Sequence, residues 1–339
     1  MTSTEQPTDS ADQLTPTDRG GAAVLTDDTL LRRRPELAPS AGWRRGVYRA
    51  SRGALNPGPS GEERRRAALL ARVTAPISGS RRVVVMSRKG GVGKTTITLA
   101  LGSTYAMLRG DRVVAVDANP DAGNLAHRVS QPCPRTITDL IGDLDLIGSY
   151  SDLRAYTAQA PESRLEVLAS DDDPKIGLAL DRGAYHRVIN LLDRYYNLIL
   201  LDTGTGILDS ANQGLLAEAD QLVLVLRPAV DGARAAALTL DWLDEHGYGE
   251  LVSRAVVVIN GDRPRPEISL EVVRAHFEQR CATVITVPWD RALEAGGRSA
   301  LPRLSAPVRD ALTQLAAAVA DQFCAHPVAP RPARSETRP

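Results

Sequence analysis

The sequence predicts an α/β protein with a mostly parallel, twisted sheet and helices on both of its faces. Short apolar runs alternate with longer amphipathic stretches along most of the chain, an alternation typical of parallel sheets. Most runs are continuous in Val, Ile and Leu, as expected for strands buried on both faces. The expected strands are 82–87, 112–117, 164–169, 197–202, 221–227, 255–260 and 283–287. The expected helices include 97–108, 181–196 and 231–246.

The composition is that of a soluble globular protein. The chain has 339 residues, 41 basic and 41 acidic side chains and 43% hydrophobic residues, which excludes fibrous, collagenous and disulfide-stapled proteins. Cys133, Cys281 and Cys324 show no CxxC spacing, which argues against a zinc or iron–sulfur site. No apolar run approaches the ~20 residues that cross a bilayer, and the amino terminus lacks a signal-peptide pattern. We therefore expect a cytoplasmic protein without a transmembrane segment.

The balanced net charge hides three unequal blocks. Residues 1–30 carry six acids against one arginine in a polar composition, which predicts a disordered acidic tail. Residues 31–82 hold thirteen arginines against three glutamates and predict an Arg-rich arm, with a short helix at 61–73. The folded domain is expected at 83–326, and the Pro- and Arg-rich residues 327–339 predict a second disordered tail.

A phosphate-binding loop follows the first expected strand. The match to K-G-G-x-G-K-T-T is Lys89, Gly90, Gly91, Val92, Gly93, Lys94, Thr95 and Thr96. Glycines let the backbone N–H groups approach a phosphate, and the helix that follows directs its positive end to the same place. Lys94 is then expected to reach the β- and γ-phosphates, and Thr95 to offer its hydroxyl to Mg²⁺. The eight matched positions disfavour a glycine-rich turn with incidental lysines.

The scarcity of lysine supports this interpretation. The chain has three lysines against 38 arginines, and two of the three are Lys89 and Lys94. A compact ammonium rather than a planar guanidinium is therefore expected to be needed in this loop.

With its extra Lys89, the loop resembles the deviant Walker A motif of the MinD/ParA ATPases, a family of P-loop NTPases. The resemblance implies ATP and Mg²⁺ as ligands and an ATP-dependent homodimer in which Lys89 reaches the phosphates of the partner. Further segments match in order over about 83–325. Residues 116–121 are similar to the switch I segment, 200–206 to the Walker B and switch II segment, and 287–290 to the loop that closes over the base.

The resemblance also implies roles for individual residues. Asp202 is expected to hold the Mg²⁺ shell, Asp117 to lie on the γ-phosphate side, and Asn260 and Pro288 to contact adenine. Each aspartate alone can also cap a turn, and Asn260 before a glycine can simply form one. The two acids end parallel strands, whose carboxyl ends meet at the edge where ligands bind in such sheets. Together they favour Mg²⁺ and water positioning.

Asn119 departs from most MinD/ParA relatives, which have an acid at this position. An amide can orient a water molecule but cannot accept its proton. Because phosphoryl transfer depends mainly on alignment and charge neutralisation, we expect slow ATP turnover that a partner can stimulate. A nucleotide-gated scaffold without hydrolysis is the alternative.

The Arg-rich arm points to one subgroup within the MinD/ParA family. The arm and parts of the core look like the MinD-like ATPases that accompany actinobacterial type VII (ESX) secretion systems. The matching segments are 42–49, 55–60 and 62–66 in the arm and 117–121, 231–234 and 242–249 in the core. Asn119 is consistent with that subgroup. The implied role is an accessory or regulatory ATPase in the cytoplasm, at the periphery of membrane machinery.

Several partners remain open for the arm. Arginines interleaved with Trp43 and Tyr48 suit an acidic protein surface of the secretion system, DNA or anionic lipid, and a solvated arm is equally compatible with the composition. The main competing function is a partition ATPase that binds DNA nonspecifically. A guanine motif, paired cysteines and a carboxy-terminal tyrosine cluster are all missing, which disfavours GTPases, metal-cluster carriers and tyrosine kinases. Residues 311–323 predict a core helix rather than a membrane anchor.

Overall fold

The computed structural model describes residues 38–119, 123–129, 135–171, 182–206, 210–263, 268–294 and 301–326. The chain divides into two compact units, residues 1–65 and 66–339. Cys133 lies outside the described residues.

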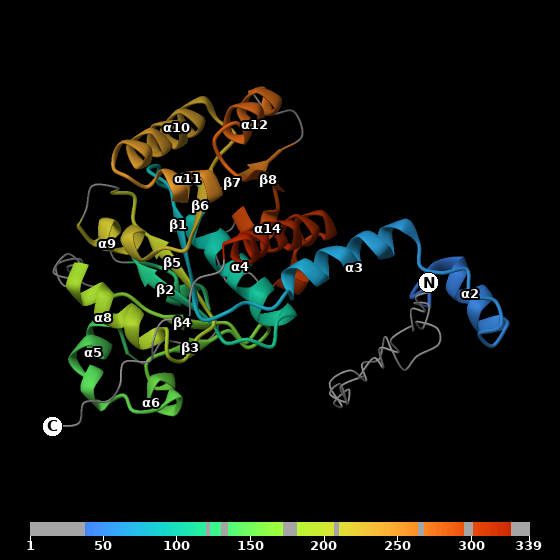
Figure 1. The fold of residues 1–339 in the computed structure, drawn as a ribbon, viewed down its shortest axis with the longest axis horizontal. Coiled ribbons are helices and arrows are strands. Elements are labelled where there is room, and N and C mark those ends of the chain that lie inside the picture. Colours follow the sequence, from blue (N-terminus) through green and yellow to red (C-terminus); the bar gives the residue numbers. More distant parts are fainter. Residues whose placement is uncertain are drawn as a thin grey trace, which may run out of the picture. The chain divides into compact units, whose positions relative to one another are not determined.

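Unit one contains helix α2, Gly42–Ala50, and the start of helix α3, Gly61–Val73 (Figure 1). Glu63 connects the two helix starts. It accepts hydrogen bonds from the backbone N–H groups of Ser40 (2.7 Å), Ala41 (3.1 Å) and Ser60 (2.7 Å). Its own N–H donates to Ser60 Oγ at 3.2 Å, so Ser60 and Glu63 form a capping box. One carboxylate therefore stabilises the amino-terminal ends of both helices.

Helix α2 was not expected from the sequence, which predicted a single helix at 61–73 in the arm. Trp43 on α2 is 69% exposed, and Leu55 after it is 64% exposed. The Arg44 side chain donates a hydrogen bond to the carbonyl oxygen of Pro57 at 2.8 Å, which connects α2 to the segment before α3. The aromatic and basic side chains of the arm thus lie on a folded element rather than on an extended strand of chain.

Unit two is built on one sheet. Among the described residues it has eight strands in the order β3-β4-β2-β5-β1-β6-β7-β8, and every pairing is parallel except β3 with β4. The strands are β1 Arg81–Met86, β2 Val113–Ala118, β3 Ala158–Gln159, β4 Glu166–Leu168, β5 Leu198–Thr203, β6 Gln221–Leu226, β7 Val256–Asp262 and β8 Thr283–Pro288. The predicted fold class is confirmed, and all seven expected strands are present. The two-residue β3 was not predicted.

Helices cover both faces of this sheet, as Figure 1 shows with α4 and α14 on one side and α8 and α9 on the other. They are α4 Lys94–Leu108, α5 Ile137–Gly142, α6 Tyr150–Arg154, α8 Arg182–Leu192, α9 Ser210–Glu218, α10 Val230–Glu245, α11 Gly249–Arg254, α12 Leu270–Glu278, α13 Arg291–Glu294 and α14 Ala306–Ala325. Short 3₁₀ turns are η2 Ala126–Arg128, η3 Leu144–Leu146 and η4 Leu301–Arg303.

The core consists of two apolar clusters, one on each face. On β1, Val83 and Val85 point into the cluster with α4 and α14, whereas Val84 and Met86 point into the cluster with α8 and α10. This division of one strand between two cores explains why the strand sequences are apolar at consecutive positions.

Helix α14 belongs to the core, as its sequence indicated. Leu312, Leu315, Val319 and Phe323 are buried, and Tyr105 of α4 donates its hydroxyl to the carbonyl oxygen of Ala316 at 2.7 Å. Within the described part of the chain, no helix is both long enough and apolar enough to cross a bilayer.

Strand β1 begins at Arg81, inside the range expected for the arm. The side chains of Arg81 and Arg82 are buried, and Arg82 pairs with Asp193 and Glu218. These two arginines therefore anchor the sheet and add no charge to the surface of the arm.

Candidate functional site

The loop between β1 and α4 has the backbone of a phosphate-binding loop. Gly91 and Gly93 have positive φ angles of 72° and 97°, a region that side chains rarely adopt. Gly93 precedes α4, and no side chain caps the helix there. The first N–H groups of α4 are thus left for a ligand, and no acidic residue lies in the first turn. A Cβ atom on Gly93 would lie 2.2 Å from Asn260 Nδ2, so only glycine fits.

Two buried acids lie side by side next to this loop. In the parallel register of β2 and β5, Asp117 is directly opposite Asp202. Thr98 Oγ1 donates to Asp202 at 3.0 Å, and the Thr95 hydroxyl is a second donor to the same carboxylate. Asp117 accepts the backbone N–H of Leu125 at 2.9 Å. The sheet itself therefore sets the spacing of the two carboxylates.

Burial dominates the electrostatics of these acids. Desolvation raises the pKa of Asp202 to about 6, against the hydrogen bonds from Thr95 and Thr98 and the charge of Lys94. Desolvation and the charge of Asp202 raise the pKa of Asp117 to about 7. Burial also lowers the pKa of Lys94, while Asp202 opposes that shift. These groups share a site in which charge is poorly solvated.

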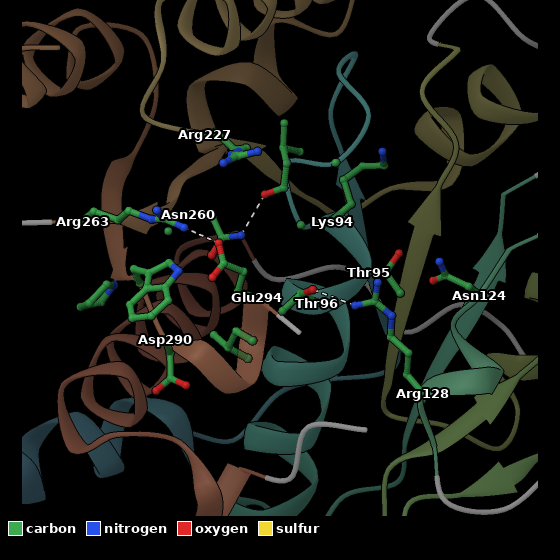
Figure 2. Close-up of a pocket in the computed structure, with 17 residues that line it drawn as sticks. Lys94, Thr95, Thr96, Asn124, Arg128, Arg227, Asn260, Arg263, Asp290 and Glu294 are labelled. Carbon is green, nitrogen blue, oxygen red and sulfur yellow. Dashed lines mark hydrogen bonds and ion pairs between the residues drawn. The ribbon is translucent and has the colours of Figure 1, made fainter. Parts of the chain in front are cut away.

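A cavity of about 380 Å³ opens in front of the loop (Figure 2). Of the residues predicted from the sequence, eight line it: Gly91, Val92, Gly93, Lys94, Thr95, Thr96, Asn260 and Pro288. Asn260 Nδ2 donates to the carbonyl oxygen of Val92 at 2.8 Å, which joins the end of β7 to the loop.

One end of this cavity is aromatic and charged. The guanidinium of Arg263 lies 5.2 Å from the ring centroid of Trp289 and also pairs with Glu294. Asp290 accepts the N–H groups of Ala292 (2.8 Å) and Ser305 (2.9 Å), which fix the loop after β8. This end offers an aromatic face and hydrogen-bonding groups to a planar ligand.

Five predicted residues lie outside the lining of the cavity: Lys89, Gly90, Asp117, Asn119 and Asp202. Asp117 and Asp202 lie buried in their strands. Asn119 donates its N–H to Asp117 Oδ1 at 3.3 Å. Lys89 forms an ion pair with Asp231 in the first turn of α10.

The structure also brings residues to the cavity that sequence reasoning missed. Trp289 and Asp290 were expected only as part of the segment 287–290, and the lining residues that were not named as site residues at all are Asn124, Arg128, Arg227, Gly261, Arg263, Leu293 and Glu294. Their position in the sequence could have indicated them, because several of these residues follow the carboxyl ends of parallel strands, where ligands bind.

The residues present fit a magnesium nucleotide. Hydroxyl and carboxylate oxygens are the ligands that Mg²⁺ prefers, and Thr95 and Asp202 supply one of each. Among the described residues, no group of three or more His, Cys, Asp or Glu side chains could hold a metal alone. Mg²⁺ typically uses one or two carboxylates together with phosphate oxygens and water, so this sparse donor set suits it.

The family of CobQ/CobB/MinD/ParA nucleotide binding domains matches residues 83–301. The chain belongs to this family. The predicted resemblance to MinD/ParA proteins is thereby confirmed.

Relatives in sequence include the ESX-1 secretion-associated protein EspI of Mycobacterium tuberculosis, which is 39% identical over 85% of this chain and 43% of its own length. The chain thus spans less than half of that relative. The septum site-determining protein MinD of Thermotoga maritima is 24% identical over 54% of this chain and 64% of its own.

Two solved structures show the same fold. The ParA family ATPase of Chlorobium tepidum has a TM-score of 0.60 and 19% identity, covering 70% of this chain and 98% of its own. The cell division ATPase MinD of Pyrococcus furiosus has a TM-score of 0.58 and 23% identity, covering 71% and 99%.

Proposed function

We propose that this chain is an ATP-binding, slowly ATP-hydrolysing switch that dimerises with ATP and serves a type VII (ESX) secretion system as an accessory or regulatory ATPase. One observation carries the proposal. The phosphate-binding loop with Lys94 and Thr95 lies at the same sheet edge as the adjacent buried acids Asp117 and Asp202. Family membership and the similarity to EspI add support.

In this proposal the nucleotide occupies the cavity with its phosphates on the loop. The backbone of residues 90–96 binds the phosphates, and Lys94 neutralises the β and γ groups. Thr95 and Asp202 hold Mg²⁺, which would screen the phosphate charge. Asn260 and Pro288 contact the adenine at the other end of the cavity.

Hydrolysis is expected to be slow because of the residues around Asp117. Its carboxylate holds the backbone at Asn119 and at Leu125, the neighbour of the cavity residue Asn124. Asp117 thus positions the segment that faces the γ-phosphate. Asn119 supplies an amide where a carboxylate would take a proton from water. If turnover is zero even with partners present, the chain is a nucleotide-gated scaffold.

The position of Lys89 supports a role between two copies of the chain. Its side chain is 39% exposed and pairs with Asp231 rather than lining the cavity of its own chain. A lysine turned outwards from its own nucleotide site is available to a second molecule. We propose that dimerisation with ATP breaks the pair with Asp231 and brings Lys89 to the partner's phosphates.

The arm is proposed to bind an acidic surface of the secretion machinery, which would place a cytoplasmic ATPase at the periphery of that machinery. Residues 38–65 present exposed arginines around the exposed Trp43. The same surface would favour DNA or anionic lipid, and nonspecific DNA binding defines the competing partition ATPase. ATP-dependent DNA binding that weakens steeply with salt would support that alternative.

The direct test is nucleotide binding by titration calorimetry with Mg-ADP. Wild type should bind, Lys94→Ala should lose binding, and Lys89→Ala should bind as wild type does. Unchanged affinity in Lys94→Ala would refute the assignment of the phosphate-binding loop.

A further inference from the structure

Arg128 occupies the phosphate end of the cavity, although no motif in the sequence marks it. It is the last residue of η2, which follows β2, and its side chain lines the cavity. Its Nη1 donates to Thr96 Oγ1 at 2.8 Å. Figure 2 shows this bond beside Thr95, with Arg263 and Glu294 in another part of the cavity. The guanidinium therefore lies against the first turn of α4.

The charge of Arg128 has no ion-pair partner among the residues that the structure describes. Among the described residues, no carboxylate lies within 4.0 Å of its guanidinium, and its hydrogen bond goes to a neutral hydroxyl. Burial lowers its pKa, and the charges of Asp202 and Asp117 oppose that shift without direct contact. Arg263, the other arginine with a resolved contact in the cavity, pairs with Glu294. A poorly solvated cation without a partner is costly unless an anion arrives.

The backbone around Arg128 is fixed before any ligand binds. Leu125 and Val129, on either side of η2, are buried. The N–H of Leu125 donates to Asp117, and the N–H of Gly123 donates to Ser170 Oγ at 3.0 Å. A Cβ atom on Gly123 would lie 1.9 Å from Asp117 Oδ1, so the chain approaches that carboxylate as closely as glycine allows. Asp117, next to the last residue of β2, therefore helps to hold the segment that carries Arg128 at the cavity.

We propose that Arg128 is a phosphate-binding residue that this chain supplies to its own nucleotide, alongside Lys94. This inference rests on the proposed nucleotide-binding function. A guanidinium can hold two phosphate oxygens at once, which a lysine cannot. The bound phosphates provide the counter-charge that Arg128 lacks within the described chain, and charge that develops during transfer to water would be stabilised by the same group.

A phosphate-binding role for Arg128 has a consequence for nucleotide binding by the monomer. Lys89 is turned to Asp231, so Lys94 and Arg128 supply half-buried cations at the phosphate end before a second copy joins. The nucleotide affinity of a single chain should then depend on Arg128 and be independent of Lys89.

The test is titration calorimetry of AMP, Mg-ADP and a non-hydrolysable Mg-ATP analogue with four proteins: wild type, Arg128→Gln, Arg128→Lys and the control Arg263→Gln. Arg128→Gln should weaken Mg-ADP and the analogue about ten- to a hundredfold, and AMP less. Arg128→Lys should recover part of the loss. Arg263→Gln should weaken all three ligands by a similar factor, because its arginine lies beside Trp289 rather than beside Thr96.

Thermal unfolding without nucleotide separates binding from a structural role. Removing a poorly solvated, unpaired charge should leave the midpoint of Arg128→Gln unchanged or higher, whereas a structural arginine would lower it. Two results would overturn the inference: wild-type affinity for Mg-ADP in Arg128→Gln, or an equal loss for AMP and the analogue. If Arg128→Gln does not fold, Arg128→Lys replaces it in the comparison. A lower ratio of Mg-ADP to AMP affinity than in wild type would support the inference, and an unchanged ratio would overturn it. A wild-type chain that binds none of the three ligands would refute the proposed function as well.

Discussion

Glu63 in the arm and Asp117 at the sheet edge are both carboxylates that order nearby backbone, yet their pKa values shift in opposite directions. Glu63 is partly exposed, and hydrogen bonds from Ser40 and Ser60 lower its pKa to about 2. Asp117 also accepts backbone hydrogen bonds, but burial and the charge of Asp202 raise its pKa to about 7. Hydrogen bonds decide the shift where water still solvates the charge, and desolvation decides it where water is excluded.

The difference separates a structural carboxylate from one at a binding site. The charge of Glu63 stabilises two helix starts and needs no ligand. The charges of Asp117 and Asp202 are costly in the free protein, and a bound Mg²⁺ or cationic group would relieve that cost. Perturbed groups of this kind gather at functional sites.

Lys94→Ala should reduce affinity for Mg-ADP at least about a hundredfold, because its half-buried ammonium neutralises phosphate charge where solvent screening is reduced. Hydrogen exchange of residues 38–65 should not change, since that segment belongs to the other unit. Altered hydrogen exchange in residues 38–65 would show that the two regions are coupled, and would contradict a purely structural role for the carboxylate of Glu63.

Gly93→Ala should destabilise the free protein by about 1–3 kcal/mol, because its φ of 97° is strained for alanine and the new Cβ meets Asn260. Gly90→Ala is the matched control in the same loop, where a Cβ meets no atom within 4 Å and φ is not positive. Thermal unfolding without nucleotide measures both. Equal midpoints for the two variants would contradict the geometry of the loop.

Asp117→Asn should change how stability depends on pH. The native state holds a proton on Asp117 up to about pH 7, whereas the unfolded chain releases it near pH 4. The free energy of unfolding of the free wild type should therefore fall as pH rises from about 4 to 7, by an amount on the order of a few kcal/mol. Asp117→Asn should flatten this dependence and reduce ATP turnover.

Denaturant unfolding at several pH values makes the measurement, with the exposed Asp145→Asn as control. A slope in Asp117→Asn as steep as that of wild type would show that burial does not set the titration of this acid.

Glu63→Gln should have the smallest effect, limited to faster hydrogen exchange at the starts of α2 and α3. The neighbouring exposed Glu62→Gln is the control. The stabilisation by Glu63 depends on pH in the opposite direction to that by Asp117. Ionised Glu63 stabilises the helix starts above about pH 4.5, and this stabilisation is lost as pH falls towards 2. Equal exchange in the two variants would contradict the role of Glu63 as a shared cap.

The sequence predicted the sheet well because its strands are continuous apolar runs between helical stretches, a pattern that burial on both faces enforces. The phosphate-binding loop was equally visible, since its glycines and lysines are adjacent in sequence. Helix α2 was missed because it has only nine residues, two of them glycines that disfavour a helix. Its start also depends on Glu63, some twenty residues away.

The cavity residues Arg128 and Arg263 could not be predicted for a related reason. Their positions depend on turns after β2 and β7, and no spacing rule connects such turns to a ligand. The strand β3 was missed because two residues carry no periodicity, and its pairing with β4 exists only in the folded sheet.

In the proposed switch, ATP binding drives dimerisation and Lys89 acts across two copies of the chain. Light scattering should compare wild type, Lys89→Ala and a chain that begins at Gly61 and so keeps α3 and β1, each with Mg-ADP and with a slowly hydrolysed Mg-ATP analogue. Only the analogue should dimerise wild type, Lys89→Ala should stay monomeric, and removal of residues 1–60 should leave dimerisation intact. A monomer in every state, or an analogue-dependent dimer that still forms in Lys89→Ala, would contradict the proposed switch.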